Sequence, residues 1–431
     1  MTEPDVPSTD LDLYDPALRA SPFAAYAGLR EAGPLLRRHP SIYLVARYDE
    51  CAAVLLDPAW GHGYSAGINP FRPGVDPATL PGSFLLMDPP DHTRLRRLVT
   101  RAFTARAIGA LRASVTALVD ELLDEAIGAG EVDLVALLTV PVPLTTICRL
   151  LDIPPADRGE FQRWAADISR GLDPDGTLTE EQIAARNAAV TWFNDYFTAL
   201  ITDRRRLIEK RGQVPEDLVG QLAAVAGDDG PLTVAELTGI CLLLLVGGFD
   251  TINSMLSSGI LALARHPDQW ELLRRAPRLA AKAVEEFLRY DTPVPFPVRV
   301  ALTDTEIAGW RLPRGTGMIV MAGSANRDPR AYADPDRLDL ARFIGDQSVP
   351  THLSFSHGPH FCLGAPLARL EGEIVFERLA SRVADIRVPD GPPQYKGGGS
   401  IRSMTGLPAR LSSPASAAVS PKPSDQRGGG R

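Results

Sequence analysis

The chain has 431 residues, of which 45 % are hydrophobic and 23 % are charged, as in an ordinary soluble globular protein. This composition excludes a collagen, a coiled-coil rod and a mostly disordered chain. The 45 lysines and arginines against 53 aspartates and glutamates give a net charge of −8, which argues against a nucleic-acid partner.

The first residues, MTEPDVPSTDLDLYDP, contain neither the basic nor the apolar segment of a secretory signal. The longest apolar run, Leu237 to Phe249, is shorter than the roughly 20 residues that span a bilayer. The four cysteines, at positions 51, 148, 241 and 362, form no C-x-x-C pair, which predicts free thiols in a reducing compartment. We therefore expect a cytoplasmic protein without a membrane partner. Nothing indicates an obligate assembly, so we expect a monomer.

Helical periodicity dominates the chain, so the predicted fold class is mainly α with small β-sheets. The predicted helices are 22–33, 93–127, 156–170, 180–211, 233–264, 268–275, 278–290 and 364–383. The predicted strands are 41–47, 298–301, 317–321 and 407–411. The longest irregular stretch, 57–91, is expected to be a lid or a binding wall. We expect a flexible extension over 1–9, one domain over 10–411 and a disordered tail over 412–431.

The segment DHTRLRRLVTRAF places His92 and Arg96 four residues apart, on one face of a helix. Arg94, Arg97 and Arg101 lie roughly on the opposite face. Such a row of arginines is either a solvated helix face or, in an acidic protein, a docking site for an acidic partner.

The long apolar helix 233–264 contains the sequence Val246-Gly-Gly-Phe-Asp250-Thr251. Two adjacent glycines inside a helix cost about 2 kcal/mol relative to alanines. The missing side chains at Gly247 and Gly248 leave room for a flat group against the backbone, or for close packing of another helix. Thr251 can divert a backbone carbonyl and open a local kink.

The most informative stretch is Phe355-Ser-His-Gly-Pro-His360-Phe-Cys362-Leu-Gly364, directly before the last predicted helix. Free amides and the helix dipole are expected to lower the pKa of Cys362 and to favour a thiolate, which suits haem iron. One alternative is a buried structural cysteine in a glycine-rich turn. Another is a zinc site built from His352, His357, His360 and Cys362.

These motifs, in this order, resemble those of the cytochrome P450 family, in particular its soluble bacterial members. The resemblance runs from LDLYDPALRASPFAAYAGLREAGPL to GLPARL, about nine-tenths of the chain. It implies a fold that holds haem b between a long distal helix and a proximal cysteine loop. It also implies these haem-binding residues: Cys362 as iron ligand, Phe355 beside the thiolate, Gly247, Gly248 and Gly364, and His92, Arg96, Arg299 and His360 at the propionates.

The resemblance assigns roles to further residues. Glu286 and Arg289 are weak as a pair in isolation, because E-x-x-R pairs are usually exposed; in the family the matching pair joins an arginine, here Arg342, to brace the haem loop. Asp250 and Thr251 match the acid–alcohol pair that relays protons. By family position, the substrate pocket draws on Phe84, Leu86, Val246, Val294, Phe296 and Met404.

The resemblance predicts a monooxygenase that inserts one atom of O2 into a hydrophobic or mixed-polarity small molecule, by hydroxylation, epoxidation or oxidative coupling. No second nucleotide-binding fold is visible, so we expect electrons from a separate ferredoxin and an NAD(P)H-dependent ferredoxin reductase. Three alternatives are a haem-thiolate sensor without turnover, a peroxide-driven peroxygenase and a structural zinc protein.

Overall fold

A computed structural model describes residues 6–72, 83–215, 217–227, 230–345, 348–397 and 400–414. Helices make up most of it, as predicted. The helices are α1 Pro16–Ala20, α2 Phe23–Ala32, α3 Tyr48–Leu56, α4 Asp91–Ala102, α5 Ala105–Ala110, α6 Arg112–Ala129, α7 Pro141–Leu150, α8 Arg158–Ser169, α9 Glu180–Arg211, α10 Leu218–Ala224, α11 Val234–Arg265, α12 Pro267–Arg275, α13 Ala280–Tyr290, α14 Ala322–Ala325 and α15 Ala365–Arg382.

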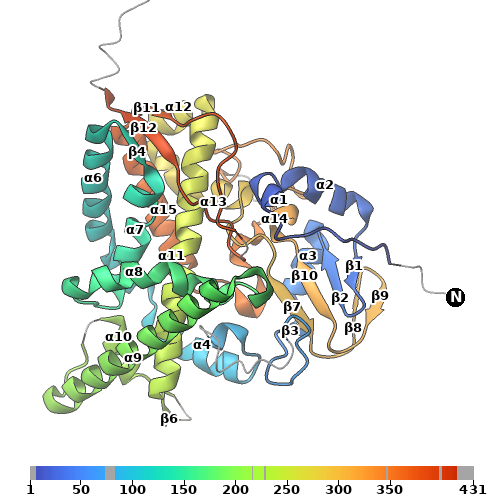
Figure 1. Ribbon diagram of the computed structural model, residues 1–431, viewed down its shortest axis with the longest axis horizontal. Coiled ribbons are helices and arrows are strands. Elements are labelled where there is room, and N and C mark those ends of the chain that lie inside the picture. Colours follow the sequence, from blue (N-terminus) through green and yellow to red (C-terminus); the bar gives the residue numbers. More distant parts are fainter. Residues whose placement is uncertain are drawn as a thin grey trace, which may run out of the picture.

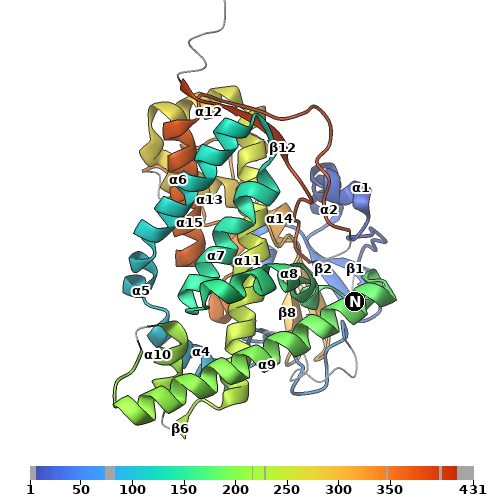
Figure 2. The ribbon, with the colours of Figure 1, turned by 60° about the vertical axis from the view of Figure 1, so that its left-hand side comes forward.

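The strands are short and form small sheets. They are β1 Leu36–His39, β2 Ile42–Val45, β3 Trp60–Gly61, β4 Glu131–Asp133, β5 Ala226–Gly227, β6 Gly230–Pro231, β7 Val298–Ala301, β8 Thr305–Ile307, β9 Trp310–Leu312, β10 Gly317–Val320, β11 Asp385–Arg387 and β12 Pro408–Ser412. The largest sheet has the order β1-β2-β10-β7-β3 and mixes parallel and antiparallel pairs. It lies to one side of the helices, with α11 between it and most of them (Figures 1 and 2).

Helix α11 is the centre of the hydrophobic core. Thr233 begins it with a capping box, in which its hydroxyl accepts from the amide of Glu236 while the Glu236 carboxylate accepts from the amide of Thr233. The helix packs against α7, α9, α13 and α15. It is long and apolar enough to cross a membrane, but most of its apolar stretch is buried inside this protein, as in the core helix of a soluble protein.

The structure differs from the prediction in three segments. The predicted helix 93–127 is three helices, because Phe103 ends α4 and the hydroxyl of Thr104 then caps α5 by accepting from the amide of Ala107 at 3.2 Å. Residues 6–9 of the predicted flexible extension pair with β1, since the amide of Thr9 donates to the carbonyl of Arg37. In the predicted tail, Ser412 belongs to β12, and residues 415–431 lie outside the described residues.

Candidate active site

The loop before α15 holds Cys362 in a fixed backbone frame. The amide of Cys362 donates to the carbonyl of Phe355 at 2.8 Å. Gly358 has φ +66°, and a Cβ there would lie 2.5 Å from the carbonyl oxygen of Leu55, so glycine lets the loop pass close to α3. A turn of the loop therefore brings the sulfur to the start of α15.

The expected low pKa of Cys362 is wrong for the protein without a bound metal. Burial raises the pKa of this thiol, although hydrogen bonds from the amides of Gly364 and Ala365 and the charge of Arg96 lower it. The helix N-terminus thus supplies the predicted donors, but loss of water around the sulfur outweighs them. Metal coordination deprotonates a thiol outright, so the same donors then stabilise the bound thiolate.

Phe355 lies beside this loop and is buried, with the guanidinium of Arg369 at 4.6 Å from its ring centre. Arg369 in turn donates to both carboxylate oxygens of Glu285, at 2.7 and 2.9 Å. The ring of His352 also binds Glu285, at 3.2 Å. These contacts orient the phenyl ring that the sequence placed at the thiolate.

Glu285 makes the stability of the folded protein depend on pH in the acidic range. Burial raises the pKa of its carboxyl, but the hydrogen bonds from Arg369 and His352 prevail and lower the pKa from 4.5 to about 2. The unfolded chain therefore binds this proton at higher pH than the folded one. The stabilisation from Glu285 is complete above pH 4.5 and is lost as the pH falls toward about 2.

We expect Glu285→Gln to lower the free energy of unfolding at about pH 6, and the difference from wild type to shrink toward about pH 3. Urea denaturation at several pH values measures this. Glu209→Gln, at an exposed position on α9, is the control and should follow wild type throughout. A difference that stays constant with pH would contradict the assignment.

The predicted zinc site does not form. His352 is bound to Glu285, whereas the ring of His360 lies 4.1 Å from that of His92. Within the described residues, no three His, Cys, Asp or Glu side chains gather as a metal site would require.

A cluster of basic side chains lies on the other side of the cysteine loop. His92 and Arg96 come from α4, Arg299 from β7 and His360 from the loop itself, so four residues predicted to lie together do so. The guanidinium of Arg96 donates to the carbonyl of Phe361, and that of Arg299 to the hydroxyl of Ser356 at 3.3 Å. In the part of the chain that the structure describes, neither guanidinium forms a salt bridge.

Burial and the neighbouring positive charges lower the pKa values of the basic groups in this cluster. Burial, followed by the charges of Arg299, His92 and Arg96, lowers the pKa of His360 to about 2. Burial likewise lowers the pKa of Arg299 to about 10 and that of His92 below its usual value. The buried Nε2 of His92 has no hydrogen-bond partner. An anion placed here would relieve both the repulsion and the unmet hydrogen bond.

Helix α11 carries the two adjacent glycines and Thr251 of the predicted site. The hydroxyl of Thr251 donates to the carbonyl of Gly247 at 2.5 Å, the diversion that the sequence suggested. A Cβ on Gly247 would meet nothing within 4 Å, whereas one on Gly248 would lie 2.7 Å from Cδ1 of Ile147. Helix packing therefore explains Gly248, and open space for a flat group remains at Gly247.

Asp250 is buried and bound to the C-terminal segment. Its Oδ1 accepts from the hydroxyl of Ser403 at 2.7 Å and from the ammonium of Lys396 at 2.8 Å. The amide of Lys396 donates to the carbonyl of Ser403 at 2.9 Å, so both partners belong to two antiparallel segments that lie side by side. Sequence reasoning missed Lys396 and Ser403, because nothing local in GGGSIRS signals a contact with a helix some 150 residues earlier.

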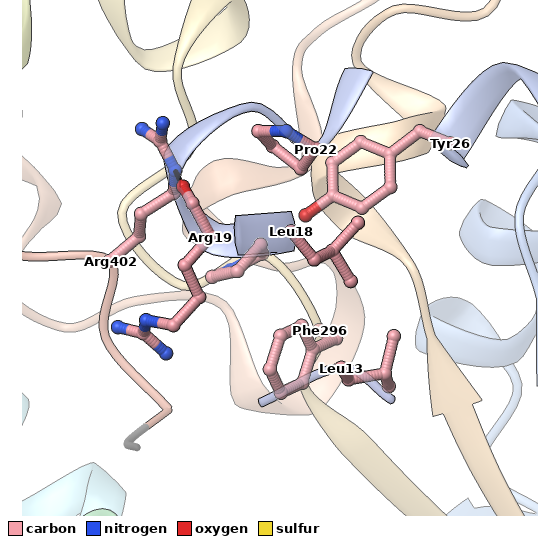
Figure 3. A pocket seen from close by; sticks show the side chains of 8 residues that line it. Leu13, Leu18, Arg19, Pro22, Tyr26, Phe296 and Arg402 are labelled. Atoms are coloured by element: carbon pink, nitrogen blue, oxygen red, sulfur yellow. Dashed lines mark hydrogen bonds between the residues drawn. The ribbon is translucent and has the colours of Figure 1, made fainter. Parts of the chain in front are cut away.

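The predicted pocket residues fall into two groups. Phe84, Val246 and Met404 are buried in the core around α11, while Leu86 and Val294 are half-buried. Phe296 lies instead in a separate cluster, in a small pocket lined by Leu13 and Tyr26 (Figure 3). Its ring meets that of Tyr14 edge-on at 5.6 Å. The structure therefore places Phe296 apart from Phe84, Val246 and Met404, and its contact with a substrate stays a prediction.

The predicted brace is present, and its Glu286 and Arg289 are fully buried. Arg289 donates from Nε and NH2 to the two oxygens of Glu286, at 2.7 and 2.8 Å, and Nε of Arg342 lies 3.2 Å from the same carboxylate. Asn326 connects the brace to the cysteine loop: its carbonyl accepts from Arg289, and its side chain accepts from the amide of Leu353.

Of the three arginines predicted to form a row on α4, only two are exposed in the structure. Arg94 is half-buried and forms a salt bridge with Glu236, whereas Arg97 and Arg101 are exposed. The exposed basic surface of α4 is thus smaller than the sequence suggested.

Comparisons with known proteins agree with this geometry. A protein-family model described as Cytochrome P450 matches residues 176–382. The chain is 36 % identical over 414 residues to the cytochrome P450 monooxygenase PikC of Streptomyces venezuelae, with 94 % of each protein covered. It is 36 % identical over 389 residues to 6-deoxyerythronolide B hydroxylase of Saccharopolyspora erythraea, covering 86 % of this chain and 91 % of that protein. The structure of the bacillaene polyketide synthase cytochrome P450 PksS of Bacillus subtilis matches with a TM-score of 0.82 at 34 % identity, covering 93 % of this chain and 100 % of that one.

Proposed function

Since this chain belongs to the cytochrome P450 family and is a haem-thiolate monooxygenase, we propose that Cys362 is the ligand of its haem iron. The main support is the contrast among the four cysteines. Cys51, Cys148 and Cys241 are buried in hydrophobic clusters, whereas Cys362 is half-buried as a residue, at the start of α15, with its sulfur facing two backbone amides.

The residues around Cys362 fit a haem. Gly247 leaves open space on α11, as a flat macrocycle needs. Within the described residues, the cluster of His92, Arg96, Arg299 and His360 offers hydrogen-bond donors without a carboxylate salt bridge, and the propionates of haem are carboxylates. We assign the four groups to the propionates on this ground.

When bound, the haem supplies the chemistry that uses O2 and two electrons to place one oxygen atom in an organic substrate. The chain contributes proton handling beside it. Lys396 reaches Asp250 from a side chain that is 38 % exposed, so Oδ1 of Asp250 is connected to solvent through this ammonium. Thr251 holds its hydroxyl against the carbonyl of Gly247, where its oxygen can accept a hydrogen bond from a water.

The substrate class is proposed from the walls of the site and from the relatives. Phe84, Val246 and Met404 give an apolar lining. Relatives are named 6-deoxyerythronolide B hydroxylase and a polyketide biosynthesis cytochrome P450. We propose a hydrophobic or mixed-polarity secondary metabolite, oxidised at a C–H bond.

The monooxygenase also requires O2 and a redox partner. We propose a ferredoxin and an NAD(P)H-dependent ferredoxin reductase as that partner, with the exposed Arg97 and Arg101 of α4 as part of the docking surface. We further propose that the enzyme works as a monomer in the cytoplasm, in keeping with its four free cysteines.

The reduced, CO-bound absorption spectrum tests the proposed function. We expect a strongly red-shifted Soret band, the signature of a cysteine-ligated haem. Candidate polyketides and other apolar compounds should then be screened for a shift from low to high spin in the ferric protein. Iron-free, colourless protein that is correctly folded would contradict the proposal.

Thr251→Ala should keep the CO spectrum but lower the product formed per NAD(P)H by about tenfold or more, because a positioned proton donor contributes 10²- to 10⁴-fold. The lost electrons should be recovered as hydrogen peroxide. Thr251→Ser keeps the hydroxyl and should behave as wild type. An unchanged product yield in Thr251→Ala would exclude the role of Thr251 and would favour a peroxide-driven enzyme.

A further inference from the structure

His62 lies at the end of β3, in a segment to which the motifs assign no cofactor contact. Its backbone is fixed from both sides. Its amide donates to Oδ1 of Asp88 at 2.7 Å, and its carbonyl accepts from the side chain of Asn69 at 2.7 Å. The amide of the next residue, Gly63, donates to the other oxygen of Asp88 at 2.8 Å. These three hydrogen bonds fix the backbone from which the imidazole of His62 projects.

The imidazole points into the basic cluster of the active site. Only 5 % of His62 is exposed, and its buried Nε2 has no hydrogen-bond partner in the part of the chain that the structure describes. Its ring meets that of His360 at 4.7 Å and 84°, and His92 lies 4.1 Å from His360. Three imidazoles thus adjoin, and two of them carry an unpartnered buried nitrogen.

Among the described residues, these two nitrogens have no acceptor. The carboxylate of Asp88 already accepts from two backbone amides. Burial lowers the pKa of His62 well below its usual range, and the charges of Arg299, His360 and His92 lower it further. A neutral imidazole can still donate one N–H, and a buried donor left unpaired costs free energy.

We infer that His62 is a fifth haem-propionate ligand, donating a hydrogen bond from Nε2 to the carboxylate edge that His92, Arg96, Arg299 and His360 also face. This inference rests on the proposed haem site. It makes the segment around β3 part of the cofactor cradle, so that His62 ties residues 60–69 to the haem.

Haem release measures the contact without a substrate or a redox partner. Holoprotein is mixed with excess apomyoglobin, and the first-order transfer of haem is followed by absorbance. We expect His62→Ala to release haem about tenfold faster than wild type, which corresponds to about 1.4 kcal/mol. His62→Gln, which keeps an N–H donor and most of the volume, should lie between them. His39→Ala, at an exposed position on β1, is the matched control and should equal wild type.

A second arm separates a hydrogen bond from simple packing. Wild type and His62→Ala are reconstituted with an iron porphyrin in which alkyl groups replace both propionates, so that no acceptor remains at that edge. If His62 binds a propionate, the difference in release rate between the two proteins should largely disappear with this porphyrin. An equal difference with both haems would show that His62 only fills space, and unchanged release with native haem would also overturn the inference.

The outcome is distinct from a failure of the proposed function. Wild type that binds no haem at all would contradict the haem site itself. Wild type with the red-shifted CO spectrum, together with His62 variants that release haem at the wild-type rate, would contradict only the role of His62. Thermal melts of the variants show whether each is folded before release is compared.

Discussion

Cys362→Ser is expected to abolish the red-shifted CO band completely. The hydroxyl of serine is a poor electron donor compared with a thiolate, and its proton is not displaced as readily by a metal. The surrounding loop should persist, because the amide of residue 362 still donates to the carbonyl of Phe355 and Gly358 still passes beside Leu55. Haem content per chain and the CO spectrum are the measurements.

Cys148→Ala is the matched control for Cys362→Ser. Cys148 is buried in the hydrophobic core on α7 and distant in sequence from the loop. Its loss creates a small cavity and lowers stability, but the CO band should keep its position. If the red-shifted band survived in Cys362→Ser and disappeared in Cys148→Ala, the iron ligand would be Cys148 and the assignment of Cys362 would be wrong.

Glu286→Gln should destabilise the protein by about 3–5 kcal/mol, the range found when one partner of a buried ion pair is removed. Glu286 and Arg289 have no exposed side-chain surface, and Arg342 is 8 % exposed. The glutamine would leave two buried guanidiniums without a counter-charge. Because Arg289 also holds the carbonyl of Asn326, the loss should reach the cysteine loop and lower haem content.

Glu160→Gln provides the comparison, because Glu160 and Arg163 form an i,i+3 pair like that of Glu286 and Arg289. The Glu160 pair is exposed on α8, so water and salt replace the lost contact and urea denaturation should hardly change. Equal losses in the two variants would show that burial of the brace does not determine its strength.

The long elements and the order of the motifs were predictable because they depend on local sequence. The apolar periodicity of α9 and α11 extends over 32 residues each, and their capping residues Thr179 and Thr233 lie beside them in the chain. Likewise, Glu286 and Arg289 face one another because an i,i+3 spacing in a helix requires it. Their link to Arg342 followed from the family resemblance alone, and their burial is seen only in the structure.

The missed features depend on contacts between distant segments. His62 reaches the basic cluster because β3 pairs with β7 and Asp88 fixes its backbone. The residues next to His62 in the sequence predict neither contact. The separate cluster of Phe296 was not predicted, because its hydrophobicity suits either core cluster and the path of residues 294–297 decides between them. The pKa of Cys362 was misjudged because sequence shows the helix N-terminus but not the exclusion of water.

The contact of Asp250 with Lys396 and Ser403 has a practical consequence for the quality of purified enzyme. Cleavage of the chain beside Lys396 would leave Cys362, α15 and the basic cluster in place. Such a preparation would show the expected colour and CO band, yet Lys396 would no longer be held against Asp250 as its connection to solvent. Mass spectrometry of the intact chain, rather than absorbance, is therefore the appropriate check before turnover numbers are compared between batches.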